Sequence, residues 1–171
     1  LEKYGMAPVH LGAKEGLALI NGTQFMAAHA VMAVAELNRV LQNADIIATL
    51  MIEGLNGSIK PFFTELHQLR PHAGNRYVAA SIFNMLHGSA ILESHKDCSR
   101  VQDPYSLRCI PQVHGASRNA WLHLKETIEI EINAVTDNPV IINDELTISG
   151  GSFHGQSIAL PLDYATLAAS E

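Results

Sequence analysis

Residues 24–55, "QFMAAHAVMAVAELNRVLQNADIIATLMIEGL", decide the fold class of this chain. Apolar residues recur in this stretch at the 3.6-residue spacing of an α-helix, and alanines extend the apolar surface around most of the circumference. Thr23 precedes the stretch as a candidate N-cap, and Asn56-Gly57 follows it as a stop signal. The pattern predicts one long helix that is buried on several sides.

Helical spacing also appears on both sides of this stretch, whereas alternation typical of strands appears only near the end of the chain. The segments "VIIN" and "LTIS", on either side of Asp144-Glu145, predict two short strands. An apolar composition rich in Ala, Leu, Ile and Val favours packing of helix on helix. We therefore expect an all-α bundle of long helices with one short β-hairpin. The further predicted helices cover residues 10–21, 61–69, 75–94 and 111–135 and a final segment after residue 156.

Charge and hydropathy exclude two classes of partner. The net charge is -6 and the basic residues are scattered, so the chain lacks the basic surface that nucleic-acid binding requires. The uncharged run 16–35 is long enough to span a membrane, but it contains Asn21 and His29 and is interrupted by Gly22. We interpret it as a buried helix and predict neither a nucleic-acid nor a membrane partner.

The cysteines and the chain ends bear on location and completeness. Cys98 and Cys109 form no CxxC pair, which indicates free thiols in a reducing cytoplasm. The sequence begins at Leu1 and stops at Glu171 within a helical pattern that has no C-cap signal. We therefore expect residues 1–171 to be one incomplete domain, the central helical part of a longer protein.

Polar residues gather in one short segment, "VQDPYSLRCIPQVHG", residues 101–115. Pro104 disfavours helix at Asp103, so the flanking side chains are presented from irregular backbone. Arg108 is the only cation between residues 100 and 118, and its planar fork suits an α-carboxylate. On local chemistry alone, an ion pair between Asp103 and Arg108 that closes a loop, with Tyr105 packed beside it, explains the segment equally well.

This segment and three others together resemble the histidine ammonia-lyases of the aromatic amino acid lyase family. The motifs are "QDPYSLRCIPQVHG", "KEGLALINGTQ" (14–24), "NAVTDNPV" (133–140) and "GGSFHGQ" (150–156), and they follow the order found in that family. The resemblance covers essentially the whole chain, and each motif is several residues long. It implies a long-helix bundle of the aromatic ammonia-lyase type.

The resemblance also implies roles for five residues. Such enzymes expel ammonia with an electrophile, 4-methylidene-imidazole-5-one (MIO), which forms from an Ala-Ser-Gly triplet of their own backbone. Asn21 corresponds to the Asn that hydrogen-bonds this group, and Arg108 to the Arg that binds the substrate carboxylate. Gln102, Tyr105 and Phe153 correspond to residues that line the pocket beside the electrophile. The family further implies a homotetramer with active sites assembled from several subunits and L-histidine as substrate.

Departures from the family pattern limit what this chain does alone. It contains no Ala-Ser-Gly triplet, since Ala116-Ser117 precedes Arg118 and Ser149-Gly150 follows Ile148. The resemblance implies that the triplet, a catalytic tyrosine and a histidine lie upstream and that an active-site glutamate lies downstream. Ser152 stands where the family usually has Asn. We expect the intact parent to convert L-histidine to urocanate and ammonia, and the isolated chain to be inactive.

Three alternatives stay open or are set aside. The substrate could be phenylalanine or tyrosine, handled by an ammonia-lyase or aminomutase of the same superfamily, or the chain could be a non-catalytic helical scaffold. Nine histidines suggest a metal site, but no H-E-x-x-H motif or tight carboxylate cluster accompanies them, and we predict none. His114 and His154 are interpreted as structural.

Overall fold

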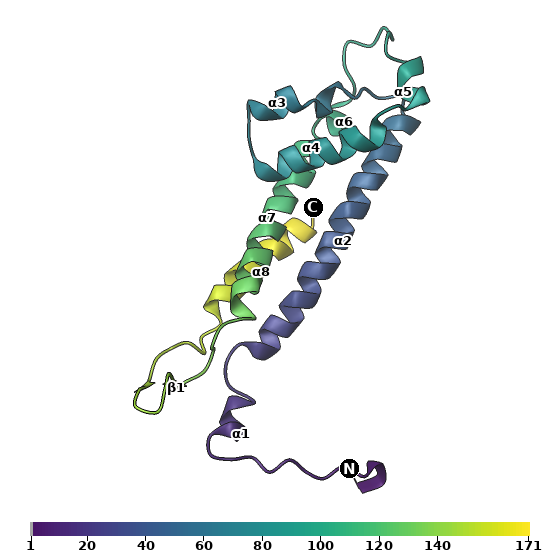
Figure 1. The fold of residues 1–171 in the computed structure, drawn as a ribbon. Helices are drawn as coiled ribbons and strands as arrows, with labels where there is room; N and C mark the ends of the chain where they lie inside the picture. The colour runs from purple at the N-terminus through teal and green to yellow at the C-terminus, as the bar shows by residue number, and fades with distance from the viewer. Residues whose placement is uncertain (1) are drawn as a thin grey trace.

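The computed structural model describes residues 2–171, and most of its regular structure is helical. The helices α2 (Gln24–Gly54), α7 (Ile110–Glu131) and α8 (Gln156–Ala169) form the long body of the molecule, and α4 (Ala73–Leu86) packs on α2 and α7 near one end (Figure 1). The predicted all-α bundle is confirmed. The shorter elements are η1 (Glu2–Tyr4), α1 (Glu15–Ala18), η2 (Lys60–Phe62), α3 (Thr64–Gln68), α5 (Ala90–Ser94) and α6 (Tyr105–Arg108).

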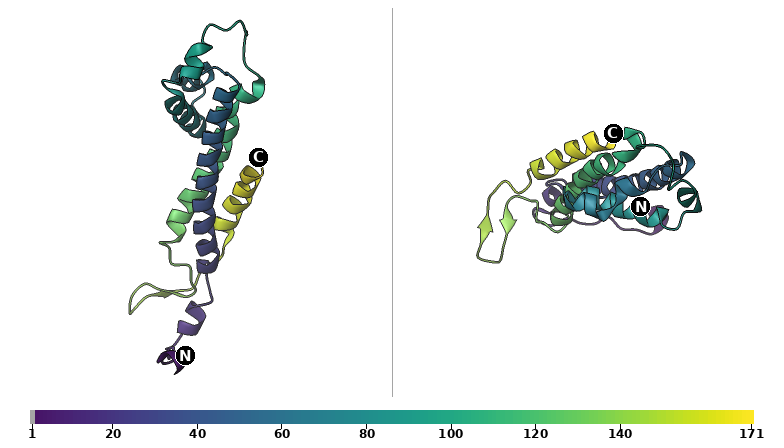
Figure 2. Two further views of the ribbon diagram at one scale, coloured as in Figure 1. Left: turned by 90° about the vertical axis from the view of Figure 1, so that its right-hand side faces the viewer. Right: turned by 90° about the horizontal axis from the view of Figure 1, so that it is seen from above.

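The predicted hairpin is also confirmed, although its strands are shorter than the alternating segments. Strand β1 (Val140–Ile141) pairs antiparallel with β2 (Thr147–Ile148), and Val140 lies opposite Ile148. In the turn, Asn143 Oδ1 accepts the backbone N–H of Glu145 at 3.0 Å, the local bonding for which Asn is favoured in turns. The hairpin projects sideways from the helices, which is clearest from above (Figure 2).

The first predicted helix, residues 10–21, is largely wrong. Only the four residues of α1 are helical there. Lys14 has a left-handed backbone with φ of 66°, and the apolar Leu19 and Ile20 are exposed in this chain. Short helices depend on tertiary packing of their apolar face, and this segment has almost none. The predicted helix 75–94 is divided into α4 and α5 at Gly88, whose φ is +78°.

Two apolar clusters form the core, one toward each end of the long body. The first joins α2, η2, α4, α6 and α7, and the second joins α2, α7 and α8. The first uses the C-terminal part of α2 and the second its N-terminal part, so α2 is common to both. The first consists of Ala48, Ile52, Phe62, Val78, Ile82, Leu86, Leu107 and Ile110; the second consists of Ala27, Ala30, Leu124, Ile128, Ile158 and Ala165.

A buried polar network crosses between α2, α4 and α7. The Asp45 carboxylate accepts hydrogen bonds from Arg118 Nη2 at 3.0 Å and from His114 Nδ1 at 2.8 Å. The Arg118 guanidinium carbon lies 4.3 Å from the centroid of the Tyr77 ring. His114 is thus a satisfied structural histidine, as its interpretation from sequence required.

Helices α4 and α7 approach each other closely at two glycines. A Cβ on Gly74 would lie 2.0 Å from the carbonyl oxygen of Gly115, and one on Gly115 would lie 2.5 Å from the backbone nitrogen of Asn75. Backbone atoms cannot move aside cheaply, so these positions accept no side chain. The glycine of the "QVHG" motif is therefore a packing requirement.

Gly115→Ala should lower the free energy of unfolding by about 1–3 kcal/mol or more, because α4 must shift away from α7. Urea denaturation of wild type and variant measures the change. Gly54→Ala is the matched control, since nothing lies within 4 Å of its added Cβ, and it should be neutral or stabilising by up to about 1 kcal/mol. Equal stability of the Gly115 variant and the wild type would contradict the close crossing.

The predicted burial of α2 on several sides is wrong for the single chain. Its buried residues, such as Ala27, Leu41 and Ile52, follow one stripe, whereas Phe25 on another face is 80% exposed. The run 16–35 is likewise not one buried helix, because a turn at residues 19–23 divides it. Within residues 2–171, no helix is both long and apolar enough to cross a membrane.

Candidate functional site

The motif Asn21-Gly22-Thr23 contacts the segment that follows α7. This contact lies by the start of α2, at the end of the molecule that is lower in Figure 1. Gly22 has φ of +93°, and a Cβ there would lie 2.1 Å from the carbonyl oxygen of Thr136. Only glycine fits both the left-handed backbone and the close contact. The backbone N–H of Thr23 also points at Thr136 Oγ1, 3.3 Å away. The two sequence motifs 14–24 and 133–140 therefore form one unit.

Thr23 does not cap α2 with its side chain, contrary to the sequence prediction. It occupies the N-cap position, but its hydroxyl donates to Glu131 Oε1 at 2.6 Å instead of accepting a backbone N–H. Because Glu131 is the last residue of α7, this bond joins the start of α2 to the end of α7. Thr23 thus connects two helices.

The Asn21 side chain is held by a charged pair. Asn21 Nδ2 donates to Asp137 Oδ1 at 2.9 Å, and Lys14 Nζ donates to Asp137 Oδ2 at 2.7 Å. Lys14 Nζ also donates to the carbonyl oxygen of Pro139. The hydrogen bond from Lys14, then that from Asn21 and then that from the backbone N–H of Asn138 lower the pKa of Asp137 from 3.8 to about 2.

This lowered pKa predicts a loss of stability in acid. A carboxyl group with a folded-state pKa below its unfolded value stabilises the fold above the unfolded pKa. The contribution of Asp137 should therefore be complete above pH 3.8 and be lost as the pH falls toward about 2. Unfolding of wild type and Asp137→Asn, compared from about pH 5 to about pH 2, should converge at the acid end. A stability gap that stays constant over this range, or that also appears for the exposed Asp144→Asn control, would contradict the assignment.

Arg108, Gln102 and Tyr105 lie together at the opposite, upper end. The guanidinium carbon of Arg108 is 5.7 Å from the centroid of the Tyr105 ring, and Arg108 and Gln102 both line a cavity of about 520 Å³. Tyr105 is 73% exposed and so does not pack in this chain. Gln102 and Arg108 thus share one cavity, whereas Tyr105 lies beside Arg108 and is not among the described lining residues.

The ion pair considered as an alternative is absent from the described residues. Arg108 Nε donates to the backbone carbonyl of Asp103 at 2.8 Å. The Asp103 carboxylate instead accepts the backbone N–H of Ser58 at 2.6 Å, so it stabilises the end of the α2 region. Within residues 2–171, the terminal guanidinium nitrogens of Arg108 have no hydrogen-bond acceptor, so they can bind another one.

The cavity beside Arg108 has the charge that an anionic ligand needs. Lys60, Lys96 and Arg100 line it together with Arg108, and Asp103 is the single carboxylate among its described lining residues. Asp103 is itself bonded to Ser58, which leaves an excess of positive charge. A carboxylate is the simplest small group that a planar guanidinium binds with two parallel hydrogen bonds.

Phe153 lies in the loop before α8 and is 43% exposed. The end of that loop is close to the start of α2, since a Cβ on Gly155 would lie 2.7 Å from Met26 Cε. The neighbouring His154 accepts the backbone N–H of Gln156 with Nδ1 at 3.2 Å, which is a structural role. Among residues 2–171, no three His, Cys, Asp or Glu side chains are placed to hold a metal ion.

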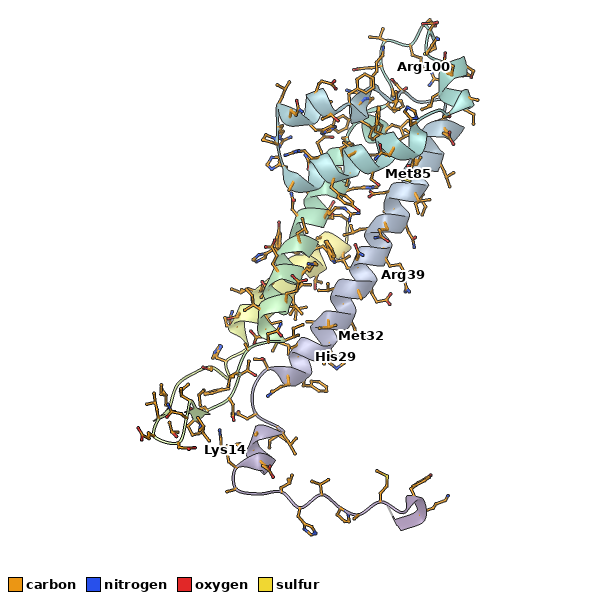
Figure 3. The ribbon with its side chains drawn as sticks, in the orientation of Figure 1. Lys14, His29, Met32, Arg39, Met85 and Arg100 are labelled. Atoms are coloured by element: carbon orange, nitrogen blue, oxygen red, sulfur yellow. The ribbon has the colours of Figure 1, made fainter. Side chains whose placement is uncertain are left out.

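The predicted site residues therefore fall into two groups, at opposite ends of α2. Asn21 and Phe153 lie near its start, and Gln102, Tyr105 and Arg108 lie beyond its end. The 31 residues of α2, at a rise of about 1.5 Å each, separate the groups by about 45 Å. Figure 3 shows this separation through Lys14 and Arg100, which are labelled at the two ends. One small substrate cannot contact both groups of a single chain.

The comparison with known families settles the membership of this chain. The family model described as aromatic amino acid lyase matches residues 1–171. The chain belongs to the aromatic amino acid lyase family. A histidine ammonia-lyase of Sorangium cellulosum is 50% identical over 178 aligned residues, which include all of this chain and 34% of that relative. This lyase chain thus spans about a third of the length of the curated relatives it matches.

Solved structures of lyase-family members share the fold. A tyrosine aminomutase from Streptomyces globisporus superimposes with a TM-score of 0.89 at 35% identity, over 98% of this chain and 35% of the other. A histidine ammonia-lyase from Trypanosoma cruzi gives a TM-score of 0.84 at 35% identity, over 98% of this chain and 30% of the other. The bundle with its hairpin is therefore a fold of this family.

We call the residues near the start of α2 the lower group and those beyond its end the upper group. Two members of the lower group, Lys14 and Asp137, were missed in the sequence analysis. Both residues lie inside motifs that carry the family resemblance, but neither was given a role there. Asp137 Oδ1 also accepts the backbone N–H of Asn138 at 2.7 Å, a local bond that is typical of Asp in turns. The available signal was weak: the motif 14–24 carries Lys14 beside Glu15, and Asp137 is the single charged residue of the motif 133–140.

Proposed function

We propose that the full-length protein that contains this chain is a histidine ammonia-lyase, which deaminates L-histidine to urocanate and ammonia in histidine catabolism. The observation that carries the proposal is the similarity of the whole chain to curated histidine ammonia-lyases. Residues 1–171 would be its central helical part, an incomplete domain. Its two free cysteines support a reducing, cytoplasmic location.

The upper group of residues would bind the substrate. Arg108 would hold the α-carboxylate of histidine through its terminal nitrogens, since its Nε is already bonded to Asp103. Gln102, which lines the same cavity, and Tyr105, whose ring lies beside Arg108, would border the bound amino acid. A fixed carboxylate leaves the molecule little freedom to rotate, so the reacting carbon is held in one orientation.

The family uses an MIO group, and the lower group of residues fits it. Asn21 presents a half-buried amide whose Nδ2 is bonded to Asp137, and within residues 2–171 no donor occupies its Oδ1. Asn21 would hydrogen-bond the group, and Phe153 would pack beside it. When formed, the group supplies the electrophile that makes ammonia a better leaving group. Because no Ala-Ser-Gly triplet occurs in this chain, we place the triplet outside residues 1–171.

A complete site would require more than one copy of the chain. Asn21 and Arg108 are about 45 Å apart along α2, far more than one histidine spans. The apolar side chains exposed on α2, including Phe25, Met32 and Leu50, support association of copies through that helix. We therefore propose a homotetramer in which one copy supplies the lower group and another the upper group.

A second candidate activity is that of an aromatic amino acid lyase or aminomutase acting on tyrosine or phenylalanine. The similarity to the tyrosine aminomutase structure favours it. A non-catalytic scaffold is less consistent with the chain, because Asn21, Gln102 and Arg108 are polar residues that a bundle does not need at these places.

The test is to assay the full-length protein with L-histidine, L-phenylalanine and L-tyrosine, following ammonia and the unsaturated acid. Urocanate formed from histidine alone supports the proposal. Ammonia or a rearranged amino acid from tyrosine or phenylalanine, with none from histidine, would replace it by the second candidate. The 171-residue chain assayed in parallel should release no ammonia, and activity in it would overturn the placement of the electrophile.

A further inference from the structure

Asp137 is bonded from three directions at the lower end of the bundle. Its Oδ1 accepts from Asn21 Nδ2 and from the backbone N–H of Asn138, and its Oδ2 accepts from Lys14 Nζ. The side chain is 17% exposed and that of Lys14 is 27% exposed. A carboxylate that accepts hydrogen bonds on both oxygens and is shielded from most of the solvent is held in a single orientation. It therefore also restricts the orientation of the side chains that it contacts.

The contact with Asp137 fixes the orientation of the Asn21 side-chain amide. An ionised carboxylate only accepts hydrogen bonds, so the Nδ2 side of the amide must face it and Oδ1 must point away. The reversed amide would place Oδ1 against Asp137 Oδ1, with repulsion in place of a hydrogen bond. The backbone of Asn21 is held as well, because its N–H donates to the carbonyl oxygen of Leu17 at 2.9 Å.

We propose that Asp137, itself held by Lys14, is a positioning residue that fixes the amide of Asn21 toward the electrophile of the active site. This inference rests on the proposed function, and it assigns to the pair a role that the fold alone does not require. Asp137 contacts none of the reacting atoms and acts only through Asn21. An amide that is already oriented needs no rearrangement when charge develops beside it, and this preorganisation is a large part of catalysis in polar sites.

A purely structural role makes a different prediction. If Lys14 and Asp137 only fasten the turn 136–139 to the start of α2, their loss would disturb the whole lower end. The effect on catalysis would then be the same with or without the Asn21 amide. If Asp137 acts through Asn21, its loss should matter only while that amide is present.

The experiment is a double-mutant cycle in the full-length protein with Asn21→Ala, Asp137→Ala and the pair. kcat and KM for histidine are measured for all four proteins, and the thermal midpoint is measured without substrate as a readout independent of activity. Asp144→Ala, an exposed carboxylate in the hairpin turn, is the matched control. Lys14→Met is the second variant, to be used in the same cycle if Asp137→Ala does not fold.

We expect Asp137→Ala to lower kcat by about 10- to 100-fold, the size of a hydrogen bond to a charged group, with little change in KM. On the Asn21→Ala background it should lower kcat no further, and the two losses in thermal midpoint should be less than additive. An equal loss of kcat on both backgrounds, or fully additive midpoints, would overturn the inference. If the wild-type protein releases ammonia from no amino acid, the proposed function itself is wrong. If the wild type is active but the effects of Asn21→Ala and Asp137→Ala on kcat are additive, only the role assigned to Asp137 is wrong.

Discussion

Replacing Arg108 by Ala in the full-length protein should lower kcat/KM for histidine by about 100-fold or more. The proposed carboxylate contact is a charge-assisted pair of hydrogen bonds, and each such bond contributes about 1.5–3 kcal/mol. Arg108→Lys keeps the positive charge but loses the planar fork, so its loss should be smaller than that of Arg108→Ala. Steady-state kinetics over a range of histidine concentrations measure both effects.

Arg108 also donates a hydrogen bond to the backbone carbonyl of Asp103, so its replacement removes a contact within the loop as well as the proposed ligand contact. A control variant and a second ligand distinguish these two effects. Arg70→Ala removes an exposed cation that is not among the described lining residues of the cavity and should change kcat/KM by less than about threefold, as expected for a screened surface charge. Histamine, which lacks the carboxylate, should inhibit wild type and Arg108→Ala equally. The role of Arg108 would be refuted if histamine and histidine lost affinity by the same factor.

Replacing Asp45 by Ala should lower the free energy of unfolding by about 3–5 kcal/mol, because it removes one partner of a buried ion pair. The side chains of Asp45 and Arg118 are 3% and 4% exposed, so the guanidinium would stay buried with its charge uncompensated. Arg118 Nε already has no hydrogen-bond partner within the described chain, which leaves little scope for compensation. Urea denaturation at neutral pH measures the change.

The matched control for Asp45 is Asp163→Ala on α8, where the carboxylate is exposed. It should change stability by less than about 0.5 kcal/mol. The double variant Asp45→Leu with Arg118→Met removes both charges together, and it should recover much of the loss, since a buried pair can often be replaced by apolar groups. A loss below about 1 kcal/mol for Asp45→Ala would mean that the network contributes little.

The long helices were predictable from sequence because their signals are local. The 3.6-residue period over residues 24–55 and the stop at Asn56-Gly57 define α2 to within one residue. Burial was not predictable, because periodicity shows which faces of a helix are apolar but not what covers them. The predicted helix 10–21 failed for a related reason: its apolar residues, such as Ile20, find no partner in this chain.

The residues of the candidate site were likewise predictable from the sequence only where their signal is local. Arg108 stood out because a lone cation beside a turn has few local explanations. Asn21 came only from family resemblance, since nothing near it in sequence marks it. Lys14 and Asp137 were missed because they are 123 residues apart, and no local pattern records a contact over that distance. Even Thr23, correctly placed before α2, had its hydroxyl partner on another helix.

The central claim is that one site takes Asn21 from one copy and Arg108 from another. Full-length Asn21→Ala and Arg108→Ala proteins, each with strongly reduced but measurable activity, should regain activity when they are co-expressed and purified as mixed oligomers. Random mixing in a symmetric oligomer gives about a quarter of sites with both residues intact. Co-expression of Asn21→Ala with a chain that carries both Asn21→Ala and Arg108→Ala is the control. It should restore no activity, because no copy then supplies Asn21. Recovery near a quarter of the wild-type rate of urocanate formation is the result we predict; no recovery in mixed oligomers would contradict a site shared between copies.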